Sequence, residues 1–292
     1  MRNAFIQELV VLARQHPQIV LIVGDLGYSV IEPFAEEFPD RFINAGVAEK
    51  NMTGLAAGMA SEGYHVFTYS IANFPTFRCA EQIRNDVAYH NLSVTVVAVG
   101  GGLAYGALGY SHHAVQDYAL IRTMPNMLIA APGDPMETRA CMRYLVENPG
   151  PSYLRLAKAG EPHFHQDVPE LEPGKLLNIR EMRTNKAIFT TGAGLQAGMA
   201  FIRKDKYSDY SLLSLPLWSM NTKAVTLEYL RQYDHVITIE DHLYDGGFGS
   251  WLLEAKARDE SISCGIKLIA LDSIVCGSVG SQEKLNKIGG IS

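Results

Sequence analysis

The chain alternates between short apolar runs and amphipathic stretches, which is the pattern of a parallel α/β sheet. Apolar runs predict strands in the first half of the chain at 19–23, 64–69, 93–99, 126–130 and 151–156. A helix is predicted over 80–90. A second helix starts at 132–135, because Pro fits a first helical turn and Asp favours the helix N-terminus.

The same pattern restarts after a stretch rich in Glu, Pro and His. It predicts further strands at 187–191, 210–215, 235–240 and 266–271. We therefore expect an α/β fold with two three-layer parallel-sheet domains, at 1–162 and 181–292, joined by a linker at 163–180. The chain shows no repeat of solenoid length.

Composition narrows the class of protein. Hydrophobic residues make up 47% and charged residues 19% of the 292, which supports a sizeable core. The net charge of −6 argues against a nucleic-acid surface. No apolar run reaches the ~18 residues that would cross a membrane. Four scattered cysteines without a CxxC, and no signal-peptide pattern, predict free thiols in the cytoplasm. The nine histidines form no HExxH, so no protein-built metal site is expected.

One acidic residue stands out. Glu49 follows the apolar run 42–48 and precedes a helix-like stretch of Gly, Ala, Met and Leu. Carboxylates are rare in such surroundings unless they are paired or hydrogen-bonded, and a carboxyl in a dry pocket is a candidate acid–base group. The alternative is a first-turn Glu that stabilises the helix N-terminus.

Two more polar groups stand at the carboxyl ends of predicted strands. Asp25 follows the strand 19–23, and His112 belongs to the glycine-rich loop 100–113 after the strand 93–99. Open parallel sheets bind ligands at this edge, so Asp25, Glu49 and His112 are expected to converge on one crevice. The many glycines would let backbone approach a ligand closely. A flexible loop with surface histidines is the alternative.

A glycine motif in the second half is less specific. Gly192-Ala193-Gly194-Leu195-Gln196-Ala197 matches the dinucleotide fingerprint G-x-G-x-x-A after a predicted strand. No acidic residue follows at the expected place. A tight strand-to-helix turn is therefore the favoured interpretation.

Together these segments resemble the transketolase family of thiamine diphosphate enzymes, specifically its pyrimidine-binding domain and transketolase C-terminal domain. The resemblance rests on residues 24–26, 42–59, 81–85, 112–117 and 125–135, and more weakly on 192, 240–242 and 246–249. The family's diphosphate-binding half, with its G-D-G…N magnesium motif, does not appear. The resemblance therefore implies a separate subunit that supplies the Mg²⁺ ligands and diphosphate contacts, in an α2β2 assembly with homodimer contacts through this chain.

The resemblance also implies roles for single residues. Glu49 matches the catalytic glutamate that hydrogen-bonds a ring nitrogen of the aminopyrimidine. His112 matches the histidine that contacts the substrate's hydroxyls. Asp25 matches an acid near the cofactor ring. Phe74, with Phe77 as the rival, matches the aromatic residue that stacks on the pyrimidine.

Three further matches concern a sugar phosphate. Arg2, Ser29 and Arg155 match the family's phosphate-binding residues, and guanidinium groups suit a dianion. The chain departs from the family at Gly100 and Leu108. Transketolases carry a His and an Asp there, which help to recognise the donor sugar. An altered donor or acceptor is therefore expected.

The resemblance implies a subunit of a split transketolase, which transfers a two-carbon ketol unit from a ketose phosphate to an aldehyde. The rival enzymes are the β subunit of a 2-oxoacid dehydrogenase and a 1-deoxyxylulose-5-phosphate synthase. A regulatory relative that binds the partner without catalysis is the non-enzyme alternative. The presence of Glu49 and His112 argues against it, because a scaffold needs neither.

Overall fold

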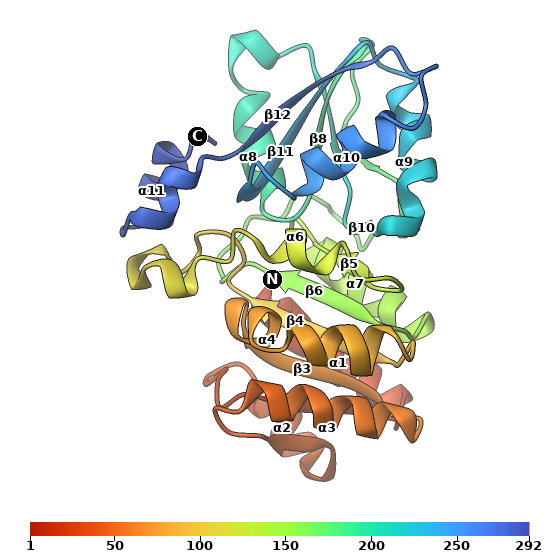
Figure 1. Cartoon of the computed structure of the whole chain (residues 1–292), viewed down its shortest axis with the longest axis vertical. Helices are drawn as coiled ribbons and strands as arrows, with labels where there is room; N and C mark the ends of the chain where they lie inside the picture. The colour runs from red at the N-terminus through yellow and green to blue at the C-terminus, as the bar shows by residue number, and fades with distance from the viewer. Residues whose placement is uncertain (292) are drawn as a thin grey trace.

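Two sheets stand one above the other in the computed structural model, which describes residues 1–291 (Figure 1). The first sheet is parallel except for one edge strand. Its strand order is β10 (Leu217–Trp218), β5 (Leu128–Ala130), β6 (Ser152–Leu156), β4 (Val94–Val99), β3 (His65–Ile71), β1 (Ile19–Val23) and β2 (Phe42–Asn44).

Helices cover both faces of the first sheet. One face carries α1 (Arg2–Gln15), α2 (Glu32–Glu37) and α7 (Pro135–Glu147). The other carries α3 (Glu49–Ser61), α4 (Asn73–Phe77), α5 (Ala80–Gln82), the π-helix η2 (Ile83–Ala88) and α6 (Asp117–Ile121). Alternate residues of β1 enter opposite cores, with Val20 on the α3 face and Leu21 on the α1 face. This confirms the predicted three-layer arrangement.

The second sheet has the order β12 (Gly265–Leu271), β11 (His235–Leu243), β8 (Lys186–Thr190), β9 (Ser211–Ser214) and β7 (Leu177–Arg180). All neighbours are parallel except β7, which pairs antiparallel with β9. The α-helices around it are α8 (Gly194–Phe201), α9 (Lys223–Leu230), α10 (Phe248–Lys256) and α11 (Gln282–Ile288). Short 3-10 turns complete the described chain: η1 (Pro39–Arg41), η3 (Gly106–Leu108), η4 (Tyr110–His112), η5 (Asp205–Tyr207), η6 (Met220–Thr222) and η7 (Ser273–Gly277).

The chain crosses between the sheets at a point that the sequence pattern did not reveal. After β9, the two residues of β10 return to the first sheet and pair antiparallel with β5. This places Trp218 at the junction, where its ring lies 5.2 Å from that of Tyr118 and 5.3 Å from that of Trp251. Aromatic contacts therefore join the two sheets into one core.

Two predicted elements differ from the structure. The helix predicted over 80–90 is present over 80–88, but only its first turn is α-helical: α5 ends at Gln82 and a π-helix follows, with the Tyr89 N–H donating to the Arg84 carbonyl at 3.1 Å. Hydrophobic periodicity does not separate these two helix types. The predicted linker 163–180 ends in the edge strand β7, because its apolar residues find a partner in β9. The boundaries at 162 and 181 stay predictions.

The glycines after β8 confirm the turn interpretation. Gly192 has a φ of +56°, and a side chain on Gly194 would overlap the carbonyl oxygen of Ile239 in β11. Small residues are therefore required by packing at the start of α8.

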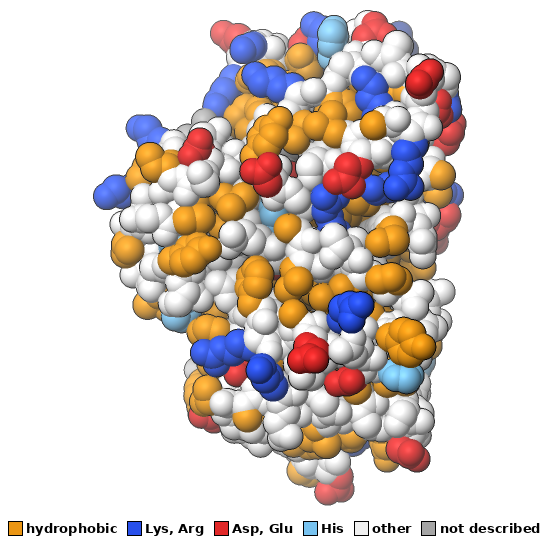
Figure 2. All heavy atoms as spheres, in the orientation of Figure 1, with side chains coloured by type: hydrophobic (Ala, Val, Ile, Leu, Met, Phe, Trp, Pro, Cys, Tyr) orange, Lys and Arg blue, Asp and Glu red, His pale blue; other side chains and the backbone are white. Residues whose placement is uncertain are grey.

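The surface and the thiols match the composition. On the face shown in Figure 2, acidic and basic side chains are interspersed with hydrophobic ones. The described part of the chain has no helix that is long and apolar enough to span a membrane. The four cysteines are free, as predicted: Cys79, Cys141 and Cys264 are buried and Cys276 is half-buried.

Candidate active site

Glu49 lies at the carboxyl edge of the first sheet. It is the first residue of α3, and its side chain is only 3% exposed. Its carboxylate accepts long hydrogen bonds from the Ser70 hydroxyl at 3.4 Å and from the Arg78 guanidinium at 3.3 Å. A Cβ on Gly24, at the end of β1, would lie 3.6 Å from Glu49 Cγ. Glu49 is therefore enclosed by the ends of β1 and β3 and is not a solvated first-turn residue.

Arg78 begins a stack of side chains that leads from Glu49 to His112. The Arg78 guanidinium lies over the Phe74 ring, with its Cζ 4.9 Å from the ring centre. The edge of Phe74 meets His112, with ring centres 5.3 Å apart and an interplanar angle of 73°. Arg78 and Phe74 thus connect Glu49 to His112, two of the three residues that the strand-end argument placed at this edge. Phe77, the rival to Phe74, ends α4 and is 45% exposed.

Asn73 holds the loop of His112 in this position. Its side-chain amide donates to the carbonyls of Ser111 and His113, both at 3.0 Å. The His112 ring contacts the Ser111 hydroxyl at 3.0 Å, while His113 is buried and faces the Gly106 carbonyl at 3.3 Å. The two histidines therefore have separate partners, as expected for neighbours in sequence.

Asp25 occupies the next strand end and adopts a left-handed conformation with φ of +54°. Its Oδ1 accepts hydrogen bonds from the Asn44 amide at 3.0 Å and from the Tyr28 hydroxyl at 3.1 Å. These bonds, that from Asn44 first, lower the pKa of Asp25. Asn44 in turn accepts from the Gly46 N–H at 2.9 Å, so Asp25 is connected to the segment that leads into Glu49.

The predicted phosphate residues do not form one group. Ser29 is exposed, has a φ of +65° and donates its backbone N–H to Glu32 at 2.7 Å. Arg2 is half-buried at the start of α1, and its Nε is buried without a partner. No hydrogen bond joins Arg2, Ser29 and Arg155 within residues 1–291. Arg2 alone keeps a free inward-facing donor.

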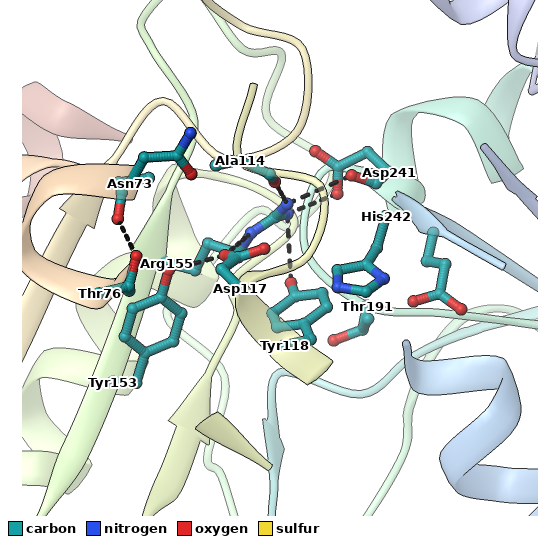
Figure 3. A network of polar contacts seen from close by, with 12 residues as sticks. Asn73, Thr76, Ala114, Asp117, Tyr118, Tyr153, Arg155, Thr191, Asp241 and His242 are labelled. Atoms are coloured by element: carbon teal, nitrogen blue, oxygen red, sulfur yellow. Dashed lines mark hydrogen bonds and ion pairs between the residues drawn. The ribbon is translucent and has the colours of Figure 1, made fainter. Parts of the chain in front are cut away.

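Arg155 corrects the sequence prediction. Its side chain is 3% exposed and lies between two carboxylates, with Nε 2.7 Å from Asp117 Oδ2 and Nη1 2.6 Å from Asp241 Oδ1 (Figure 3). It also donates to the Ala114 carbonyl at 2.8 Å, and its Cζ lies 4.4 Å from the centre of the Tyr118 ring. These partners occupy the guanidinium fork, so Arg155 connects the two sheets and is not available to a phosphate.

The glycines of the loop fit around the same network. A side chain on Gly101 would lie 2.6 Å from Arg155 Nε, and one on Gly102, whose φ is +64°, would overlap the Asp241 carboxylate. These glycines therefore leave room for the side chains of Arg155 and Asp241, whereas the sequence analysis expected them to leave room for a ligand. Leu108, the other departure from the family, is 59% exposed in η3.

Sequence reasoning missed several residues of this edge: Asn44, Ser70, Asn73, Arg78, Tyr105 and Lys158. Asn73 and Arg78 carried a usable signal, because they are the polar residues at the two ends of the short helix α4, which follows β3: Asn73 is its first residue and Arg78 follows its last. Within residues 1–291, no group of three or more His, Cys, Asp or Glu side chains could hold a metal ion.

The fold and this edge define a two-domain α/β protein with a buried carboxylate at the strand ends of its first sheet. A family model described as "Transketolase, pyrimidine binding domain" matches residues 1–160. The chain is 35% identical to one of the subunits of the apulose-4-phosphate transketolase of Phocaeicola vulgatus over 267 residues, 88% of this chain and 84% of that one. The chain therefore belongs to the transketolase family.

Two further similarities bear on its subunit type. A solved structure titled "Split gene transketolase, inactive beta4 tetramer" is 29% identical and has a TM-score of 0.86, over 100% of this chain and 93% of that chain. The transketolase of Campylobacter jejuni shares the fold at 16% identity and a TM-score of 0.79, but this chain covers only 44% of it.

Proposed function

We propose that this chain is one subunit of a thiamine diphosphate-dependent split transketolase. It transfers a two-carbon ketol unit from a ketose phosphate to an aldehyde when combined with a diphosphate-binding subunit. The buried carboxyl of Glu49, enclosed at the strand ends beside Phe74 and His112, is the observation that carries this proposal. Two relatives that match along 84% and 83% of their own length are themselves named as transketolase subunits.

The residues at this edge fit the pyrimidine half of the cofactor. The nearest donors to Glu49 lie at 3.3 and 3.4 Å, so its oxygens keep capacity for a strong hydrogen bond to a ring nitrogen. Phe74 is half-buried beside them, which suits stacking on a flat ring. Asp25 keeps one carboxylate oxygen unbonded by the described residues. Thiamine diphosphate, when bound, supplies the carbanion stabilisation that ketol transfer requires.

In this proposal the side chains of this chain hold and orient the cofactor and the substrate. Glu49 holds a proton at the pyrimidine nitrogen, and its burial excludes water from that bond. His112, fixed by Ser111 and by the edge of Phe74, faces the same edge and hydrogen-bonds substrate hydroxyls. Arg2, whose guanidinium makes no hydrogen bond within residues 1–291, is the group that binds an anionic part of the substrate in this proposal.

The partner completes the site in this proposal. Mg²⁺ ligands and diphosphate contacts come from the other subunit, in an α2β2 assembly in the cytoplasm with homodimer contacts through this chain. The similar apulose-4-phosphate transketolase protein of Phocaeicola vulgatus is itself named as a subunit, which supports a partner that supplies the remainder of the site. The β4 tetramer of the similar split-gene protein is titled inactive, which also fits a site that one subunit does not complete.

The test is Glu49→Gln in the complex reconstituted with its diphosphate-binding subunit. Loss of the proton-holding group should lower ketol transfer by at least ~10²-fold, while the fold persists by circular dichroism. Glu62→Gln, at the exposed far end of the same helix, is the matched control and should leave the rate unchanged. The isolated chain with thiamine diphosphate and Mg²⁺ should show no turnover. Near-normal activity of Glu49→Gln, or turnover by the chain alone, would contradict the proposal.

A second candidate rests on one specific similarity. The 1-deoxy-D-xylulose-5-phosphate synthase of Methylacidiphilum infernorum is 31% identical over 86% of this chain, which covers 40% of that protein. An assay with a 2-oxoacid as donor in place of the ketose phosphate distinguishes this candidate from a transketolase. Release of CO₂ with the 2-oxoacid, and no transfer from a ketose, would favour the synthase or a 2-oxoacid dehydrogenase subunit.

A further inference from the structure

Tyr105 takes the space of a side chain that this chain lacks. Gly100 directly follows β4 with a φ of +82°, and a Cβ built there would overlap the Tyr105 ring, with the ring's Cζ at 3.2 Å. Position 100 is one of the two at which the loop departs from the family. The space beside this strand end is therefore occupied by the phenol ring of Tyr105, which lies five residues further along the loop.

The start of the loop is fixed to β6, which holds this ring in place. The N–H groups of Gly100 and Gly101 both donate to the Leu156 carbonyl, at 2.8 and 3.1 Å. Lys158 follows two residues after Leu156, and its Nζ lies 5.4 Å from the centre of the Tyr105 ring. The cation thus covers one side of the ring.

A second neighbour of Tyr105 is His112, which contacts the substrate in the proposed function. Its ring centre lies 6.5 Å from that of His112, at an interplanar angle of 72°. Burial raises the pKa of Tyr69, and the nearby charge of Arg2 opposes this shift while Tyr105 adds to it. Tyr105 itself is half-buried, and its hydroxyl makes no hydrogen bond within residues 1–291. A half-buried ring with an unused hydroxyl, near His112 and the Lys158 ammonium group, is placed to contact a substrate.

We propose that Tyr105 is a specificity-determining residue that limits the length of the acceptor aldehyde. This inference rests on the proposed ketol transfer. The ring shortens the pocket next to His112, so a short aldose phosphate fits while the extra hydroxyl-bearing carbons of a longer one meet the ring. The Tyr105 phenol also offers one hydrogen bond from a neutral group. The His that transketolases carry at position 100 could instead be charged.

The test compares acceptors of two lengths in the reconstituted complex. With a fixed ketose donor, kcat/KM is measured for glyceraldehyde 3-phosphate and for ribose 5-phosphate. Tyr105→Ala should raise the ratio of the longer to the shorter acceptor by about tenfold or more, since pocket contacts of this size discriminate by that amount. Tyr105→Phe should keep the length preference and raise KM by about two- to tenfold through loss of one hydrogen bond. Tyr110→Phe, an exposed position of the same loop, is the control.

Binding gives a readout that does not require turnover. Calorimetric titration of both aldose phosphates into each complex should show the same shift in preference. An unchanged ratio in Tyr105→Ala, with an active wild type, would overturn the role of Tyr105 and leave ketol transfer standing. A wild-type complex that neither turns over nor binds these sugars would overturn the proposed function and this inference together. If Tyr105→Ala fails to fold, Tyr105→Leu gives the same test with the space partly filled.

Discussion

Removing Arg155 should destabilise the protein far more than removing a surface arginine. In Arg155→Met the carboxylates of Asp117 and Asp241, both buried, would lose their shared cation. Breaking a buried ion pair from one side costs about 3–5 kcal/mol, because the remaining charge stays uncompensated. Against a typical total of about 5–15 kcal/mol, this is a large fraction of the free energy of unfolding.

The control is Arg14→Met, which breaks the ion pair of Arg14 with Glu37. That pair is exposed, with side-chain exposures of 58% and 36%, and such pairs contribute about 0–1 kcal/mol. Comparing the two variants separates burial from the mere loss of an ion pair.

Urea unfolding followed by tryptophan fluorescence measures the difference. Trp218 and Trp251 are both buried near the junction, and Trp218 contacts the Tyr118 ring on which Arg155 lies. The unfolding midpoint should fall strongly in Arg155→Met and barely in Arg14→Met. The double replacement Asp117→Asn/Asp241→Asn in the Arg155→Met background should recover part of the loss. Equal small shifts in Arg155→Met and Arg14→Met would refute the view that this network holds the sheets together.

Two further predictions address acid stability and the loop of His112. Burial lowers the pKa of His65 to about 4, so between pH 6.5 and 4 the unfolded chain binds a proton that the native state does not, and stability falls as the pH drops through this window. His65→Gln should therefore show a shallower loss of stability across pH 6.5–4 in urea titrations, and an unchanged slope would contradict this. Asn73→Ala should raise KM about tenfold and cost about 1–2 kcal/mol of stability, because two hydrogen bonds to the loop are lost. Equal KM in the two proteins would show that the loop is held by other contacts.

The sequence predicted nine of the twelve strands that residues 1–291 form in the two sheets, because buried parallel strands are nearly continuous apolar runs, and it missed the short strands β2, β7 and β10. It also predicted that Asp25, Glu49 and His112 share one edge, since the carboxyl ends of parallel strands meet there. Each of these conclusions depends on local pattern together with one general rule of sheet geometry. The return of β10 to the first sheet was not predictable in this way, because two residues carry no periodicity.

The sequence by itself therefore determined the fold class, the family and the position of the buried carboxylate. Only the tertiary structure decided what Arg155 does, because its partner Asp241 lies 86 residues away in the second sheet and no local pattern records that contact. The tertiary structure likewise decided that Tyr105 fills the space above Gly100. The sequence reveals that position 100 has no side chain, but only the structure reveals which residue occupies that space. Side-chain pairing across the junction depends on how the two sheets pack, and packing is a property of the whole chain.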